Sequence, residues 1–500
     1  MSVVSVADLT GIQRFVFGSA RLRDNVVASC RLRWVLDDDQ RDSPLCVAMR
    51  ASGGEVIGSG GGNAVVRHPD RTTAGTWAAH LTRKITDQVP GLGLVVGHAE
   101  DGDGLAAAML GALADADRRK RLGVSHAPLP LLPGVATCEL TGQAAVTVRD
   151  GSPMGATVAA LRRTIPGAPD AGTGDCELKT QYGATAREPL ELDHLGRTHG
   201  EQSDIAVVHL DGNGFGARIQ RWLRHHARVA TPDDELGEEY AFDGLRLDDI
   251  MERVEQAVLK AATDAVGLDD DGEPVLRGHG DGTGFRLHTA EDGRSVHLPV
   301  RIVLRAGDDL TFVCDARVAH ALARVALRAL HDAVERPDDR PFGTEPISAA
   351  AGLAVHRAHH PIRLLAEEAE RRTTAAKARQ AALDWSLWDR TSEDLTSLQD
   401  GKSISARPLD LDGVDRLLSA VAELQRPPWS HRRGRRRAVL DAVRAGQDEE
   451  AAFLAAAARH GELRLPDRDI PPSRSVTADA LQLQELVVLP VGLDPAEVRS

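Results

Sequence analysis

The sequence of 500 residues contains few cysteines and no long apolar run. Its five cysteines, at positions 30, 46, 138, 176 and 314, include no Cys-x-x-Cys pair, so they support neither a zinc finger nor a disulfide framework. The longest apolar runs are far shorter than a membrane span, and Met1 leads into a predicted strand without a signal peptide. We therefore expect a cytoplasmic protein that does not associate with a membrane.

Basic charge is also in short supply, because the net charge is −14. An acidic surface does not attract nucleic acid indiscriminately, and nothing in the sequence requires DNA binding. One segment differs, since five arginines between Arg432 and Arg437 follow Trp429. These residues either bind RNA phosphates and stack a base, or pack against the acidic surface of the same protein. The second interpretation is favoured.

Two short stretches, Ile205–Gly216 and Val303–Val313, carry the main chemical signal. The first is typical of a buried strand that breaks at Asp211 into a glycine-rich turn and a helix. The second is typical of two strands joined by the hairpin tip Gly307–Asp309. If these strands are neighbours in one sheet, the three aspartates meet at one end of it.

Three carboxylates without basic partners repel one another, and a divalent cation is the usual remedy. The sequence therefore predicts Mg²⁺ or Mn²⁺ held by Asp211, Asp308 and Asp309, with triphosphate oxygens completing the coordination, as in nucleotide transfer. The alternative is that Gly-Asp-Asp is merely a polar turn. Candidates for holding phosphate near the start of the following helix and at the hairpin tip are Gly212, Asn213, Gly214, Phe215, Gly216 and Gly307.

The elements from about residue 205 to 355 follow the order β-α-β-β-α-β, with a helix appended. This is the ferredoxin-like order, found in the palm of many nucleotidyl transferases and cyclases. Lys377, near the end of the appended helix, is either placed to reach a bound triphosphate or is a solvated surface lysine. A long insertion at about 230–298 contains the acidic runs 233–239 and 269–271, which we expect to be solvated loops.

The first hundred residues repeat this order. A strand ends at Asp8, and a later hairpin has a tip of Gly60, Gly61, Gly62 and Asn63 in place of paired aspartates. We interpret this unit as a second palm that lacks the acidic pair. Its glycine tip either cradles phosphate through backbone N–H groups or serves only a tight turn.

The overall prediction is an α+β protein in which two ferredoxin-like (βαββαβ) palms pack as a pseudo-dimer, followed by a C-terminal helical bundle. The predicted units are a degenerate palm at 1–100, a connector at 101–200, a catalytic palm at 201–395 and the helical domain at 405–500. Within the connector, Val135–Val148 suits an additional strand-rich subdomain. In the last unit we expect helices over Leu409–Leu424, Arg436–Ala445 and Asp448–His460.

Several motifs in order resemble the large signature subunit of type III CRISPR effector complexes. They cover roughly residues 1–100 and 200–390 and are Asp8–Phe17, Leu210–Gly216, Ala306–Asp309, Ala350–His356, His360–Ile362 and Ala376-Lys377. The resemblance implies palms that bind two ATP molecules and polymerise ATP into cyclic oligoadenylate, a second messenger of antiviral defence. It also implies other effector subunits and guide or target RNA as partners.

This chain departs from the family pattern at two positions, where Asn213 replaces an aspartate and Ala306 replaces a glycine. It also lacks the HD nuclease motif and the zinc-finger cysteines that many large family members carry. A metal-dependent nucleotidyl cyclase is the leading hypothesis, because the carboxylates persist. The alternative is a catalytically inactive palm-pair scaffold of an RNA-guided ribonucleoprotein.

Overall fold

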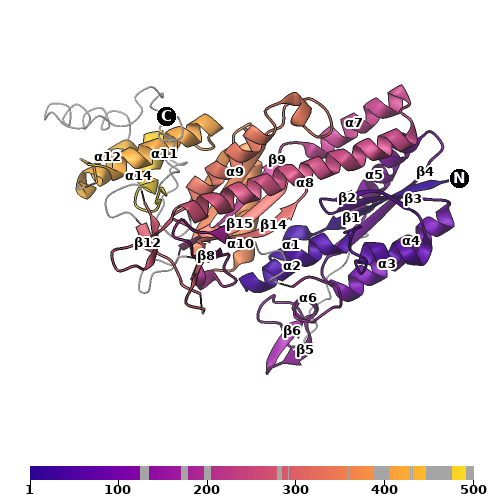
Figure 1. Cartoon of the computed structure of the whole chain (residues 1–500), viewed down its shortest axis with the longest axis horizontal. Helices are drawn as coiled ribbons and strands as arrows, with labels where there is room; N and C mark the ends of the chain where they lie inside the picture. The colour runs from indigo at the N-terminus through magenta and orange to yellow at the C-terminus, as the bar shows by residue number, and fades with distance from the viewer. Residues whose placement is uncertain are drawn as a thin grey trace.

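The computed structural model shows a mixed α+β protein (Figure 1). The described residues are 1–123, 134–170, 178–195, 204–278, 284–290, 292–358, 360–387, 405–427, 429–430, 432–445 and 476–490. None of the helices within these ranges is long and apolar enough to cross a bilayer. The predicted helix at 448–460 and Cys176 lie outside the described residues.

The first sheet, here the N-terminal sheet, has the strand order β2-β3-β1-β4. Its strands are β1 (Val3–Thr10), β2 (Glu55–Gly60), β3 (Asn63–His68) and β4 (Gly93–Glu100). Its helices are α1 (Ile12–Val16), α2 (Leu22–Val35), α3 (Pro44–Ser52) and α4 (Arg71–Gln88). The chain therefore runs β-α-β-β-α-β here, as the sequence predicted, with the glycine-rich tip between β2 and β3.

The second sheet, here the central sheet, has the order β14-β15-β9-β16-β17, whose first four strands repeat the order of the N-terminal sheet. Its strands are β9 (Asp204–Gly212), β14 (Val300–Ala306), β15 (Asp309–Asp315), β16 (Ala349–Arg357) and β17 (Leu383–Leu387). Strand β17 was not predicted; it extends the sheet by pairing parallel to β16.

Helices cover both faces of the central sheet. They are α8 (Asp233–Asp264), α9 (Ala319–Ala333) and α10 (Ile362–Ala378). Helix α7 (Phe215–Val229) lies between β9 and α8 in the sequence. Alternate residues of β9 face different helices, because Val208 lies in the core cluster that contains Leu322 of α9, whereas Val207 lies in the cluster that contains Leu365 of α10. Strand β9 is thus buried on both faces, which explains its continuous apolar run.

The acidic run 233–239 corrects one expectation. It forms the first turns of α8, a helix that runs along much of the molecule (Figure 1), and is not a solvated loop. Acidic side chains are favoured in a first helical turn, because they interact with the positive end of the helix dipole. The Asp233 carboxylate also accepts a hydrogen bond from the backbone N–H of Leu105 at 2.9 Å and pairs with Arg67 at 2.7 Å. Asp233, within this acidic run, therefore joins the two halves of the chain.

In each sheet, one glycine allows the helix that follows the fourth strand to pack closely against that strand. A Cβ atom at Gly97 of β4 would lie 2.1 Å from the carbonyl oxygen of Ala112 on α5 (Leu105–Arg121). A Cβ atom at Gly352 of β16 would lie 2.0 Å from the carbonyl oxygen of Ala369 on α10. Helix α5, which lies within the stretch predicted as a connector, thus packs on the N-terminal sheet as α10 packs on the central sheet.

The two halves of the chain pack against each other through their helices and strands. Helix α5 of the first half contacts α7 of the second, and α1 of the first contacts α10 of the second. One core cluster contains Ala7 of β1 together with Val207 of β9, and another contains Leu105 of α5 together with Trp222 of α7. The cluster with Ala7 and Val207 also contains Val66 of β3 and Leu304 of β14, so the β2–β3 and β14–β15 hairpins share it.

The remaining elements are small or lie near the C-terminus. The connector and the insertion contribute β5 (Ala145–Arg149), β6 (Ser152–Gly155), α6 (Ala156–Leu161), β7 (Leu178–Lys179), β8 (Thr185–Arg187), η1 (Leu192–His194), β10 (Val266–Leu268), β11 (Pro274–Arg277), β12 (Gly284–Arg286) and β13 (Ser295–His297). A short helix η2 (Pro337–Asp339) follows α9. The C-terminal helices are α11 (Leu411–Gln425), α12 (Arg433–Ala445) and α14 (Val476–Leu483). Arg324 of α9 joins Asp415 of α11 at 2.5 Å.

The arginine-rich segment contacts the rest of the protein. Arg433 pairs with Glu485 at 2.9 Å, and Arg436 donates to the carbonyl oxygen of Leu424 at 3.2 Å. Trp429 is only 4% exposed, so its ring is packed in the core and is not presented to a base. The proposed base-stacking role of Trp429 is therefore wrong, and the contacts of Arg433 and Arg436 follow the alternative interpretation.

Candidate metal and nucleotide site

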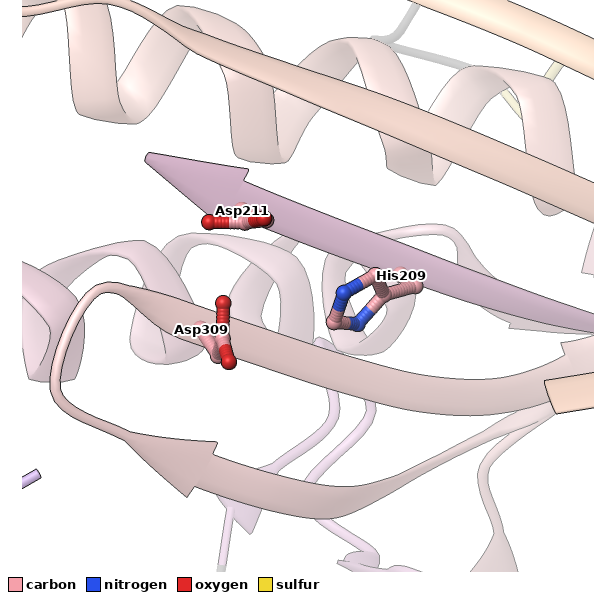
Figure 2. Close-up of side chains that lie close together, drawn as sticks. All are labelled: His209, Asp211 and Asp309. Carbon is pink, nitrogen blue, oxygen red and sulfur yellow. The ribbon is translucent and has the colours of Figure 1, made fainter. Parts of the chain in front are cut away.

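The three predicted aspartates converge at one end of the central sheet. Asp211 of β9 and Asp309 of β15 are directly opposite one another in the antiparallel register, and their side chains are hydrogen-bonded. Asp308 lies at the hairpin tip, where a Cβ atom at position 212 would come within 2.8 Å of its carboxylate oxygen. Gly212 is thus required for the Asp308 side chain to lie against β9. Figure 2 shows Asp211 and Asp309 on these two neighbouring strands.

The carboxylates of this cluster have too little positive charge near them to offset their mutual repulsion. Burial, followed by the nearby charge of Asp211, raises the pKa of Asp308 to about 6. Burial, followed by the charges of Asp211 and Asp308, raises the pKa of Asp309 well above its ordinary value. Both carboxyls therefore hold a proton to a higher pH than an ordinary aspartate does, and a bound cation would favour their ionised forms. The donor set fits a divalent cation, which binds ionised carboxylate oxygens.

Lys377 provides the nearest positive charge. Its ammonium group, near the end of α10, pairs with the carboxylate of Asp211 and donates to the carbonyl oxygen of Gly212 at 2.9 Å. It therefore lies at the site and is not a solvated surface lysine, while its contact with a triphosphate stays a prediction. One lysine offsets one of three carboxylates, so the cluster keeps a negative charge when all three are ionised.

The backbone after Asp211 offers fewer phosphate donors than the sequence suggested. The N–H of Gly212 donates to the carbonyl oxygen of Asp308 at 3.2 Å, and the N–H of Asn213 donates to that of Ser348 at 2.8 Å. Both groups are already used to close the turn. Phe215 is 5% exposed and packs its ring in the core, so its side chain is structural. The remaining candidates are N–H groups in the first turn of α7, which begins after Gly214 in the left-handed conformation.

A cavity of about 610 Å³ is lined by Lys377, which pairs with Asp211, and by the nearby Asn213. Its polar lining comes from Asn213, Ser348 and Lys377 and from His331, Gln380 and Asp410. Apolar residues that include Leu327, Ile347 and Leu411 supply the rest. A cavity whose lining is divided between polar and apolar groups suits a small organic ligand that carries both kinds of surface. Its position places such a ligand between the central sheet and α11.

The N-terminal sheet has a matching site with a different charge balance. Asp8 of β1 is directly opposite Asn63 of β3, the same register that Asp211 and Asp309 have. The carboxylate of Asp8 pairs with Lys120 of α5. The two lysines hold equivalent helix positions. Lys120 lies four residues after Ala116, the residue that contacts Gly97 of the N-terminal sheet. Lys377 lies four residues after Thr373, the residue that contacts Gly352 of the central sheet. One carboxylate balanced by one lysine gives this site no evident need for a cation.

The two hairpin tips meet backbone to backbone. A Cβ atom at Gly61 would lie 3.0 Å from the Cα of Gly307, and one at Gly307 would lie 3.2 Å from the Cα of Gly61. Both residues have φ of +60°, which side-chain-bearing residues rarely adopt. This contact accounts for glycine at both tips. The phosphate cradle predicted for Gly60–Asn63 stays a prediction.

The sequence-based prediction did not identify three residues of this region. His209 precedes Asp211 by two positions and so lies on the same face of β9, while Thr311 holds the equivalent position beside Asp309 on β15. Strand alternation was the signal that could have found both. Lys120 could not be found in this way, because its approach to Asp8 depends on how α5 crosses the sheet.

No family model and no curated protein matches the sequence. Among solved structures, the Csm1–Csm4 cassette in complex with cA3 gives a TM-score of 0.57 at 14% identity and covers 97% of this chain and 70% of that chain. The cassette in complex with cA4 gives a TM-score of 0.55 at 13% identity and covers 97% and 69%.

A third similar structure is the Csm1–Csm4 subcomplex in the type III-A CRISPR-Csm interference complex, with a TM-score of 0.56 at 14% identity and coverage of 97% and 69%. At this identity the likeness concerns the fold. Csm1 is the large subunit, so the resemblance predicted from the sequence motifs is confirmed at the level of the fold.

Proposed function

We propose that this protein is a two-palm nucleotidyl cyclase that polymerises ATP into a cyclic oligoadenylate second messenger in CRISPR-type antiviral defence. In this proposal the N-terminal and central sheets are the palms of a pseudo-dimer, and only the central palm carries the cation. The observation that carries the proposal is the convergence of Asp211, Asp308 and Asp309 beside one lysine and a cavity of about 610 Å³.

Each residue of the cluster has a role in the proposed reaction. Asp211, Asp308 and Asp309 would hold Mg²⁺ or Mn²⁺, which would supply activation of a 3′-hydroxyl and neutralisation of charge on pyrophosphate. Lys377 keeps Asp211 in place and is positioned to contact the triphosphate. The first-turn N–H groups of α7 face the same end of the sheet and can hold a phosphate oxygen. The adjoining cavity takes the base.

The similar structures support this choice of substrate and partners. Csm1–Csm4 assemblies of the same fold have been solved with cA3, with cA4 and with pppApA. By analogy we propose ATP as the substrate and other CRISPR effector subunits, together with guide or target RNA, as partners.

The two departures from the family pattern are accommodated by local contacts. The side-chain amide of Asn213 donates to the hydroxyl of Ser348 at 2.8 Å, so this residue closes the turn and does not face the carboxylates. Ala306 packs against the core cluster that both halves share. Neither residue belongs to the carboxylate cluster, so both departures are compatible with catalysis.

The proposed function is tested by product analysis. The protein, alone and assembled with its RNA-bound partner subunits, is incubated with ATP and Mg²⁺ or Mn²⁺, and products are separated by chromatography with mass spectrometry. We expect pyrophosphate and adenylate oligomers, including a cyclic species. ATP left unchanged by the RNA-activated assembly in both metals would contradict the proposal and favour the scaffold alternative.

The contact between the hairpin tips gives a prediction for the pseudo-dimer. Gly61→Ala introduces a Cβ atom 3.0 Å from Gly307 and should displace the catalytic hairpin. A displacement of about 1 Å can cost roughly 100-fold in rate, so we expect a large loss of product formation. Gly53→Ala is the matched control, because Gly53 has a φ of +80° but no atom within 4 Å of its added Cβ. Equal activity of the two variants would show that the tips are not coupled.

A further inference from the structure

A histidine and a threonine lie directly behind the carboxylate pair. His209 is opposite Thr311 in the register, two positions from the pair formed by Asp211 and Asp309, and all four side chains lie on the same face of the sheet. Nδ1 of His209 and the hydroxyl of Thr311 are 2.8 Å apart. One ring nitrogen of His209 and one oxygen each of Asp211 and Asp309 all lie within 4.8 Å of one another (Figure 2).

The N-terminal sheet provides an internal comparison for this pair. Behind Asp8 and Asn63, the two equivalent positions hold Val6 and Val65, which are opposite one another in the same register. Both valines are buried, at 1% and 3% exposure. The repeated fold therefore accepts an apolar pair at these positions, and valine is well suited to a strand. The half of the molecule that lacks the acidic pair also lacks the histidine and the threonine.

A buried imidazole needs a physical reason, because polar groups lose hydration when they leave water. His209 is 4% exposed and donates or accepts only one described side-chain hydrogen bond, to Thr311. A histidine that binds a metal uses one ring nitrogen, while a hydrogen bond at the other nitrogen fixes the tautomer and the ring orientation. The Thr311 hydroxyl is placed to provide that second contact.

We propose that His209 is a nitrogen ligand of the divalent cation bound by Asp211 and Asp309, and that the site therefore prefers Mn²⁺ to Mg²⁺. Mg²⁺ is bound almost entirely through oxygen, whereas imidazole is a common ligand of first-row transition metals. This inference rests on the proposed function only in requiring that a cation binds at these carboxylates. Catalysis is not part of its test.

The test is pulsed electron paramagnetic resonance of the intact protein loaded with Mn²⁺. We expect electron spin echo modulation from a directly bound imidazole ¹⁴N, and its replacement by ¹⁵N modulation when the protein is labelled with ¹⁵N-histidine. His209→Val, which copies Val6, should remove the modulation. It should also weaken Mn²⁺ binding at least about tenfold, as loss of metal-site partners commonly does. Mg²⁺ binding should change less, which Mg²⁺ competition against bound Mn²⁺ measures.

The controls separate this inference from the proposed function. His331→Gln changes an exposed histidine that lines the adjoining cavity, and it should leave the nitrogen modulation unchanged. Mn²⁺ bound with no histidine nitrogen in the wild-type protein would overturn the inference while leaving the carboxylate site intact. Failure of the wild-type protein to bind Mn²⁺ or Mg²⁺ at all would contradict the proposed function as well. Since the labelling experiment uses the wild-type sequence, the outcome does not depend on the folding of a variant.

Discussion

Replacing Asp308 and Asp309 with asparagine is expected to abolish product formation. The substitution keeps the shape of both side chains but removes two of the three carboxylates that hold the cation. Metal ions in such reactions contribute several kcal/mol of transition-state stabilisation, so the rate should fall by about a thousandfold or more. Product analysis in the RNA-activated assembly measures the loss.

The same substitution should leave the metal-free protein as stable as before or more stable. Because folding raises the pKa of Asp308 to about 6 and that of Asp309 further, the folded state holds these protons more tightly than the unfolded state. The contribution of these two carboxyls to stability is therefore fully present below their ordinary pKa and is lost as the pH rises through their raised values. The variant lacks this loss, so its melting temperature should exceed that of the wild type at pH 7 and match it near pH 4.

Asp338→Asn with Asp339→Asn is the matched control, because it changes two adjacent aspartates on the exposed short helix η2. This variant should keep its activity and show no such gain in stability. Full activity of the Asp308 and Asp309 variant would contradict the assignment of the cation site. A large fall in its melting temperature at pH 7 would show that the two carboxylates stabilise the hairpin.

The second large effect distinguishes the two proposed palms. Asp211→Asn should reduce product formation by about a thousandfold, because it removes a proposed ligand of the cation. Asp8→Asn should reduce it far less. Asp8 holds the same register position but faces Asn63 and pairs with Lys120, so we expect no cation to depend on it. The rates of both variants are measured at saturating ATP and metal, with folding checked by melting temperature.

Equal losses for the two variants, with folding intact, would show that both palms contribute to catalysis or that the cation lies in the other palm. A reversed order would contradict the account outright. The comparison is sharp because the two aspartates occupy equivalent positions in sheets of the same strand order.

The sequence predicted the central features of the site for a definite reason. Asp211, Asp308 and Asp309 lie at strand ends, and the βαββαβ order makes their strands neighbours, so local patterns determine their convergence. The same reasoning found the glycine tip opposite Asp8. The expected loop at 233–239 was wrong, because a run of acids after Pro232 is equally suited to the first turn of a helix.

Contacts that depend on tertiary packing could not be predicted from the sequence. Trp429 beside five arginines resembles a nucleic-acid site in the sequence, and only the structure shows that its ring is buried. The hydrogen bonds from Gly212 and Asn213 to distant carbonyl oxygens also depend on loops that no local pattern places. The pairing of Lys120 with Asp8 spans more than a hundred residues and follows from the crossing of α5 over the sheet.

The central claim is that Asp211, Asp308 and Asp309 bind ATP through a divalent cation. Isothermal titration calorimetry of ATP into the wild-type protein, with Mn²⁺ or Mg²⁺ and then with a chelator, tests this claim most directly. The account predicts a binding event that requires the cation and disappears in the variant with Asp308→Asn and Asp309→Asn. Cation-dependent ATP binding of unchanged affinity in that variant would contradict it.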